Sequence, residues 1–366
     1  MVNYKPTLTK YILKSFAFWN GIIAFILSVV AVLFNLIELM RKAGHHHNSI
    51  KFGKILKAVF LSLPTVLDQL SPLIVLFATM GLLWSLHKKY EIVVMRSLGY
   101  SIWSVIKPMI LAVFLYSLLY FSFLNPLAAT FKEEYGRYYD HIFQKSSDLS
   151  GVSKSGLWLK HIHPNLDYSI IHITRLVDQN TFGPSTIYSF SEGGQFLLRY
   201  DVGKILVSPH QWYLENPTKT ESNDIQQKVD SFIWENALSL DKIHQTFHPP
   251  ASLSFWKLPK FISLIEKTGL SSMEHSLYFF NLLMKPWTLL AMVLIGGVCA
   301  FASVRQKNGF IFILSGIFSG FFLHFFHQIF YALGESLKIP LFFAILTPTF
   351  VSLLIGIITL IHLEEG

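Results

Sequence analysis

The residues best placed to do chemistry are ionisable side chains inside long apolar segments. Asp68 and Lys285 are of this kind, and His324 and His327 stand at i and i+3 in a further apolar segment. Charged groups in such surroundings are costly and usually face the interior of a helix bundle or a wet pathway. Asp68 and Lys285 therefore indicate a polar path through a bundle, unless Lys285 reaches out to water from a helix end. The two histidines either bind a metal or haem or form hydrogen bonds inside the bundle.

Four motifs of known catalytic or metal-binding machinery are absent from the sequence. It contains no G-x-x-x-x-G-K-[ST], so the chain cannot hydrolyse ATP through a P-loop. H-E-x-x-H, C-x-x-C and G-x-S-x-G are also missing. The single cysteine, Cys299, excludes an internal disulfide and a cysteine-based metal cluster. The tract His45–His47 could hold a transition metal, but a solvated loop explains it more simply. We predict no catalytic residue, no metal site and no cofactor.

The segment Tyr90–Gly99 (YEIVVMRSLG) is short, mixed in character and placed between two long apolar runs. In a helix, Glu91, Met95 and Leu98 stand at i, i+4 and i+7 and share one face, and Gly99 supplies a stop. A short helix with an acid beside apolar residues suits docking into a groove on a soluble partner. The alternative is a turn that only joins two membrane spans.

The composition is that of an integral membrane protein. Hydrophobic residues make up 52% of the 366 residues and charged residues only 14%, whereas soluble domains carry about 25% charged residues. The first apolar run is too long for a signal peptide, so we interpret it as a retained span. Three predicted spans precede a long polar insert and three follow it, each long enough for a hydrocarbon core of about 30 Å. The spans are residues 15–40, 57–84, 102–125, 278–304, 309–333 and 340–363.

Basic residues in the short loops indicate the orientation. With the N-terminus in the cytoplasm, nine of them lie inside and six outside, which favours this orientation. A basic cluster at the outer surface needs an anionic partner, such as lipid headgroups, a polyanionic ligand or an acidic subunit, unless it is simply solvated. Five of the six outer residues lie between spans 1 and 2: Arg41, Lys42, Lys51, Lys54 and Lys57.

The polar insert, residues 127–258, contains short runs in which apolar and polar residues alternate, as in half-buried strands. Gly193 and Gly194 join two of them in a hairpin. Six or more such strands predict a β-sandwich or jelly-roll-like domain outside the membrane. After it, residues 254–268 are typical of an amphipathic helix on the membrane surface. The runs are 157–163, 168–177, 186–190, 196–200, 204–208 and 211–215.

The sequence thus predicts an α-helical membrane protein of six transmembrane helices with an inserted β-jelly-roll-like domain. Residues 1–126 form spans 1 to 3 with a cytoplasmic helix near 88–99. Residues 127–258 form the external β-domain, periplasmic in a Gram-negative bacterium. Residues 259–366 form the interfacial helix and spans 4 to 6.

Several motifs, in this order and at these separations, resemble the LptF/LptG (YjgP/YjgQ) permease family of the lipopolysaccharide exporter. The segment Glu91–Gly99 is similar to the family's E-L-V-V-M-R-A-x-G, and Glu38–Gly44 (ELMRKAG) resembles the basic run of the LptG branch. The chain is therefore most similar to LptG. Further matches are the pair Pro64 and Pro72, Gly156–Trp158, Trp212–Asn216, Lys285–Pro286 and Ser315–Phe330.

The resemblance implies a permease subunit without its own ATPase, in the bacterial inner membrane, that extracts lipopolysaccharide and passes it to the periplasmic bridge. Its implied partners are LptF, a dimer of the ATPase LptB, and LptC, with no nucleic acid. Glu91 would meet a basic residue of LptB, with Val94, Met95 and Leu98 in the same docking helix. Spans 1, 2 and 5 would line a space for acyl chains.

The resemblance also implies a site for the lipid phosphates at the outer end of span 1. Arg41 and Lys42 would meet the phosphates of lipid A, with Glu38 in the same run. Asn35 stands where the LptG pattern often has a further lysine. Arg137 is an approximate match to a basic residue of the family near the β-domain.

Other functions are compatible with parts of the pattern. The chain could be the LptF-type partner, or another engine-driven exporter subunit of the FtsX or MacB kind, although these usually have four spans. A membrane enzyme acting on lipid headgroups would need acid, base or metal-binding groups that converge at one interface. The only candidates for such groups are Asp68, His324 and His327. A structural anchor that uses the β-domain as a docking platform is a further alternative.

Overall fold

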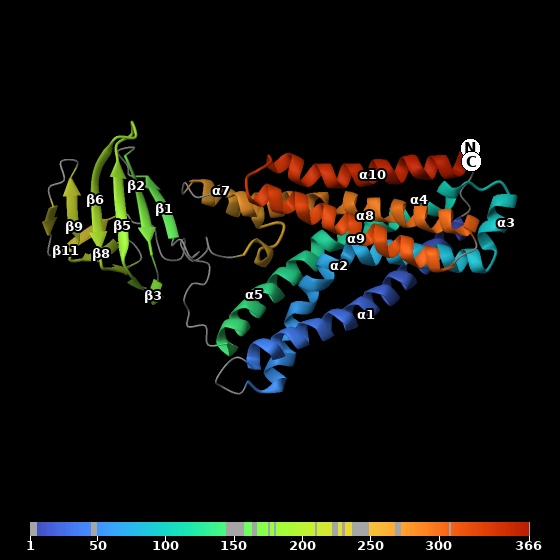
Figure 1. Ribbon diagram of the computed structural model, residues 1–366, viewed down its shortest axis with the longest axis horizontal. Coiled ribbons are helices and arrows are strands. Elements are labelled where there is room, and N and C mark those ends of the chain that lie inside the picture. Colours follow the sequence, from blue (N-terminus) through green and yellow to red (C-terminus); the bar gives the residue numbers. More distant parts are fainter. Residues whose placement is uncertain are drawn as a thin grey trace. The chain divides into compact units, whose positions relative to one another are not determined.

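The computed structural model describes residues 6–44, 50–143, 157–162, 167–174, 176–178, 181–208, 211–221, 226–228, 231–235, 249–267, 272–306 and 309–365. The chain divides into two compact units, Met1–Tyr135 with Met273–Gly366, and Gly136–Ser272. The first unit is helical, and the second contains the strands (Figure 1).

Within the described residues, six helices are long and apolar enough to cross a membrane. Their positions confirm the six predicted spans, and the helices extend beyond them at most ends. The third span continues from α4 through a π-helical segment, Tyr120–Leu124, into α5. The helices are α1 (Pro6–Gly44), α2 (Phe52–Lys88), α3 (Glu91–Ser97), α4 (Ile102–Leu119), α5 (Asn125–Ile142), α7 (Leu258–Lys267), α8 (Met273–Gln306), α9 (Gly309–Glu335) and α10 (Leu341–Glu365).

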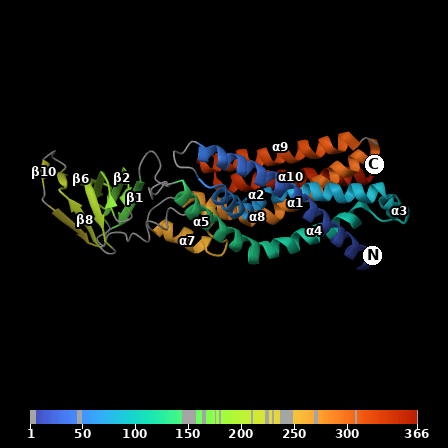
Figure 2. The ribbon, with the colours of Figure 1, turned by 90° about the horizontal axis from the view of Figure 1, so that it is seen from below.

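Helix α8 lies at the centre of the helical unit, where it packs against α2, α4, α9 and α10. Helices α8, α9 and α10 run side by side in both views (Figures 1 and 2). The core contains Leu76, Ile106 and Val293, all fully buried. Gly296 allows the close approach of α8 to α2, because an added Cβ would lie 2.9 Å from the Leu76 carbonyl oxygen.

Helix α1 has few neighbours within the chain. It packs against α2 and α4, yet only 11% of its most apolar stretch is buried, against 56% for α8. Phe25 and Phe34 are each 71% exposed on it. Most of the apolar surface of α1 is therefore available to lipid or to another protein.

Proline lies inside four of the long helices, and Pro72 has a visible consequence in α2. Proline has no N–H, so residue 72 cannot bond the carbonyl four residues earlier. That carbonyl belongs to Asp68, and it accepts instead from the Ser71 hydroxyl at 2.7 Å and from Lys285 Nζ at 3.2 Å. A side chain from α8 thus satisfies a backbone group that proline leaves open in α2.

The second unit holds two antiparallel sheets, which confirms the predicted β-sandwich class. Their strand orders are β1-β2-β5-β6-β9-β10 and β11-β8-β7-β4-β3. The two faces meet in one core, in which Trp212 and Phe182 are fully buried with ring centroids 5.4 Å apart. The strands are β1 (Leu157–Ile162), β2 (Tyr168–Ile173), β3 (Leu176–Asp178), β4 (Thr181–Phe182), β5 (Ser185–Phe190), β6 (Phe196–Val202), β7 (Lys204–Val207), β8 (Gln211–Glu215), β9 (Thr218–Glu221), β10 (Gln226–Lys228) and β11 (Ser231–Glu235).

Two details of the sandwich differ from the sequence prediction. The run 168–177 is not one strand, because β2 ends at Ile173 and β3, from Leu176, belongs to the other sheet. The strands β9, β10 and β11 were not anticipated, and β9 and β10 are almost wholly polar. The hairpin at Gly193 and Gly194 is confirmed, since it connects the paired strands β5 and β6, with φ of 78° at Gly194.

Candidate functional site

The short helix α3 lies between α2 and α4, as the motif in Tyr90–Gly99 predicts. It ends in a Schellman arrangement, in which the N–H of Tyr100 donates to the Met95 carbonyl and that of Gly99 to the Arg96 carbonyl, both at 3.0 Å. Gly99 has a φ of 83°, which a residue with a Cβ adopts only at a cost. The predicted glycine stop is therefore present in the structure.

The two faces of α3 differ from the predicted assignment. Ile92 is buried and Met95 packs against the core of the helical unit. Val94 and Leu98 are 56% and 70% exposed, and Tyr90, four residues before Val94, is 71% exposed. The exposed apolar face is thus Tyr90, Val94 and Leu98, and Met95 supports the helix from the inner side.

Glu91 is held by a hydrogen bond from α1. The Tyr11 hydroxyl lies 3.1 Å from Oε1 and 2.9 Å from Oε2 of Glu91, and donates to this carboxylate. Tyr11 is 41% exposed, so the contact lies at the surface of the unit. It connects α3 to the first turns of α1, a contact that the sequence did not indicate because 80 residues separate the partners.

The C-terminal end of α1 carries the predicted basic run. Arg41 is exposed, and Lys42 Nζ lies 2.6 Å from the Glu38 carboxylate, one helical turn earlier. Asn35 is half-buried on the same helix. Lys51, at the N-terminus of α2, and Lys54 and Lys57, in its first turns, are exposed. The tract His45–His47 lies outside the described residues.

Arg137 is exposed on α5. It belongs to the second unit, which begins at Gly136, whereas Arg41 and Lys42 belong to the first. The structure therefore brings Arg41, Lys42 and Glu38 together on one helix, whereas Arg137 belongs to the other unit.

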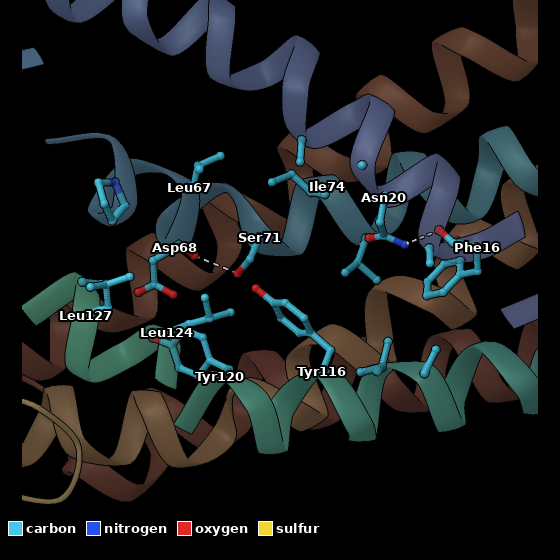
Figure 3. A pocket seen from close by; sticks show the side chains of 18 of the residues that line it. Phe16, Asn20, Leu67, Asp68, Ser71, Ile74, Tyr116, Tyr120, Leu124 and Leu127 are labelled. Carbon is cyan, nitrogen blue, oxygen red and sulfur yellow. Dashed lines mark hydrogen bonds between the residues drawn. The ribbon is translucent and has the colours of Figure 1, made fainter. Parts of the chain in front are cut away.

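A cavity of about 550 Å³ lies between α1, α2, α4 and the start of α5 (Figure 3). Its wall is mostly apolar, with Ala17, Gly21 and Ala24 along α1. The acyl-chain space expected from spans 1, 2 and 5 differs from this cavity, whose lining comes from spans 1, 2 and 3. Its polar lining residues are Asn20, Asp68, Ser71, Tyr116 and Tyr120.

Asp68, which lines the cavity, forms an ion pair with Lys285 of α8. Their side chains are 17% and 12% exposed. Lys285 Nζ also lies 4.1 Å from the centroid of the Tyr120 ring, a cation–π contact. Lys285 thus points into the bundle and does not reach out to water. The pair has no net charge, so the polar side of the cavity adjoins a neutral group.

The two histidines of α9 have contacts inside the helical unit. His327 Nε2 lies 3.1 Å from Asn281 Oδ1 of α8, and His324 packs edge-to-face against the Phe325 ring. Among the described residues no group of three metal-binding side chains occurs.

These features define a class: a polytopic membrane protein with an inserted β-sandwich, an exposed short helix between two spans, and no nucleotide-binding motif. Residues 10–362 match the family model described as "Lipopolysaccharide export system permease LptF/LptG". The chain therefore belongs to the LptF/LptG family of lipopolysaccharide export permeases, and it is a multi-pass membrane protein.

Two curated relatives carry the name lipopolysaccharide export system permease protein LptG. The one from Haemophilus influenzae is 23% identical over 357 residues, which cover 94% of this chain and 95% of the relative. The one from Escherichia coli K12 is 22% identical over 349 residues, which cover 93% and 94%. A permease subunit of this family is a component of a transporter and not itself an enzyme.

Proposed function

We propose that this chain is the LptG-type permease subunit of an exporter in the bacterial inner membrane. It extracts lipopolysaccharide from that membrane and passes it to the periplasmic bridge. Its partners in this proposal are LptF, a dimer of the ATPase LptB, and LptC. The observation that carries the proposal is α3, an exposed helix between two spans of an export permease that has no nucleotide-binding motif of its own.

In this proposal α3 is the contact with the ATPase, on the cytoplasmic side. Val94 and Leu98 enter an apolar groove of LptB, and Glu91 meets a basic residue at its rim. Met95 fixes the depth of the helix from the inner side, because it packs on the helical core. Closure of the ATPase dimer then moves α3, and the Tyr11–Glu91 contact transmits the movement to α1.

At the other end of α1, Arg41 and Lys42 bind the phosphates of lipopolysaccharide. Glu38 holds the Lys42 side chain in place, and Asn35 adds a neutral hydrogen-bonding group on the same helix. Arg137 contacts the lipid later, at the β-domain. We assign residues 1–126 and 259–366 to the membrane portion and residues 127–258 to the periplasmic jelly roll. The exposed apolar faces of α1 and α9 are then available to the partner subunit and to lipid.

The first test is native mass spectrometry of the protein purified in mild detergent from its own host. The expected assembly contains one further six-span protein, two copies of a P-loop ATPase, and bound lipopolysaccharide. If the six-span partner is itself of the LptG type, this chain takes the LptF role. If the protein is isolated alone and without glycolipid, the proposal is wrong.

The second test measures ATP hydrolysis coupled to lipopolysaccharide release in proteoliposomes. Glu91→Lys should abolish coupling, because it places a cation against the basic rim of the ATPase groove. The matched control is Glu335→Lys, which reverses an exposed charge at the end of α9. Equal activity of the two variants would contradict the role of α3.

A further inference from the structure

The cavity between α1, α2 and α4 is suited to a long, thin, apolar ligand. Its lining positions on α2 run from Leu63 to Val75, about 18 Å at 1.5 Å of rise per residue. Its volume, about 550 Å³, is within the range of small-molecule sites. The cavity is formed by one chain, between helices that can span a membrane.

Small side chains create the space. Ala17, Gly21 and Ala24 recur along α1 at spacings of four and three residues, so they lie on one face. A Cβ added at Gly21 would meet nothing within 4 Å. Packed protein interiors leave few voids of this size, and an empty apolar space of this length would forfeit the contacts of all its lining atoms.

One polar group in the cavity has no hydrogen-bond partner among the described residues. Tyr116 extends from α4 toward Ser71 of α2, with its hydroxyl directed into the space between them (Figure 3). In the part of the chain that the structure describes, this hydroxyl forms no hydrogen bond. The neighbouring Tyr120 hydroxyl accepts from Asn125 at 3.3 Å, and the Ser71 hydroxyl donates to the Asp68 carbonyl. Tyr116 is therefore the cavity-lining hydroxyl that forms no hydrogen bond with the described residues, and its O–H can donate to a ligand.

The charges around the cavity exclude an anionic group inside it. Among the described residues no lysine or arginine lines the cavity, and Lys285 is engaged by Asp68 and Tyr120. A phosphate would instead approach the Asp68 carboxylate, which is unfavourable. A ligand with an anionic head must leave that head outside and insert only its chain.

We infer that this cavity holds one acyl chain of a bilayer glycerophospholipid, with Tyr116 donating to the ester carbonyl of that chain. The ester is the uncharged acceptor that the chain of such a lipid carries, and the six membrane helices bring the cavity into contact with bilayer lipid. The site is separate from the basic run at Arg41 and Lys42 and does not depend on the export role.

The test uses the full-length protein in vesicles of phosphatidylethanolamine and phosphatidylglycerol. A trace of the phosphatidylethanolamine carries a diazirine at the end of one acyl chain. After illumination, cross-linked peptides should include residues 16–24, 63–75 and 112–128. Gly21→Leu fills the cavity, and labelling of these peptides should fall to the background that lipid on the outer faces of the helices gives. Tyr116→Phe removes only the hydroxyl, and labelling should fall about fivefold, the factor that one hydrogen bond of ordinary net strength provides.

The matched control is Gly53→Leu, because an added Cβ at Gly53 also meets nothing within 4 Å but the residue does not line the cavity. Its labelling should equal that of the unchanged protein. Equal labelling of Gly21→Leu and Gly53→Leu would overturn the inference, and so would labelling that avoids all three peptides. If lipopolysaccharide displaces the probe and unlabelled phospholipid does not, the site belongs to the glycolipid and the phospholipid assignment is wrong.

Discussion

Removal of the cation from the Asp68–Lys285 pair should strongly destabilise the helical unit. Lys285→Met keeps an unbranched side chain, one atom shorter, and removes its charge, which leaves the Asp68 carboxylate without its cation beside an apolar cavity. Both side chains are largely buried, and breaking a buried pair from one side costs about 3–5 kcal/mol. Asp68→Asn should lower the free energy of unfolding by less, about 1–3 kcal/mol. Lys285 then still has its hydrogen bond to the backbone carbonyl of residue 68 and its contact with the Tyr120 ring.

The double variant Asp68→Asn/Lys285→Met separates the pair from its surroundings. It leaves no unpaired ion, so its free energy of unfolding should exceed that of Lys285→Met alone. The cycle of the two single variants and the double variant should then give a coupling energy of about 2 kcal/mol or more.

Cys299 provides the assay. It is the only cysteine of the chain, and its side chain is buried on α8, the helix that carries Lys285. A fluorogenic maleimide reacts with this thiol only as the helical unit opens, during a thermal or SDS titration in mixed micelles. The control is Lys42→Met, which removes the exposed pair with Glu38 and should cost less than about 1 kcal/mol. The reasoning is refuted if Lys285→Met and Lys42→Met lower the free energy of unfolding equally. It is also refuted if the double variant lowers it by the sum of the two single decreases.

Three further predictions concern other parts of the chain. Tyr11→Phe should change the free energy of unfolding by less than about 1 kcal/mol, because its contact with Glu91 is exposed. It should nevertheless lower the lipopolysaccharide-stimulated ATP turnover of the assembled complex. Unchanged turnover would contradict the proposed transmission of movement from α3 to α1. Replacement of Arg41 and Lys42 by Gln should weaken lipopolysaccharide binding and flatten its dependence on salt, and a binding titration at two ionic strengths decides this. Trp212→Ala should destabilise the β-sandwich by about 3–5 kcal/mol, measured by limited proteolysis of the second unit, whereas Tyr213→Ala, on the exposed face of the same strand, should have little effect.

The spans were predictable because burial in a bilayer requires long apolar runs, whatever the tertiary contacts are. The stop of α3 was also predictable, since Gly99 is the residue type that a positive φ requires. Asp68 and Lys285 were expected to face the bundle interior because charge is costly in a membrane. Their pairing with each other was not predictable, since it depends on how α8 crosses α2 and on the carbonyl that Pro72 leaves open.

The remaining differences come from contacts between elements that are distant in the chain. Helical periodicity predicts that Met95 and Leu98 share one exposed face of α3. In the structure Met95 packs against the core of the helical unit and Val94 is exposed. Strand β9, which lies between β6 and β10, and the edge strand β10 are held by backbone hydrogen bonds and carry almost no apolar pattern, so alternation could not reveal them. The cavity depends on small residues of α1 meeting α4, which is a property of packing and not of either segment alone.

The Asp68–Lys285 pair also sets a condition on biogenesis. The two residues are 217 positions apart, and the whole β-sandwich lies between them in the chain. At about 5–20 residues per second, α2 leaves the ribosome about 10 to 40 s before α8 does. During that interval α2 stays in or near the membrane with an acid whose cation has not yet been made. Asp68 must therefore be tolerated or sheltered until the fourth span arrives, and α8 can supply its cation only after the whole β-sandwich has been synthesised.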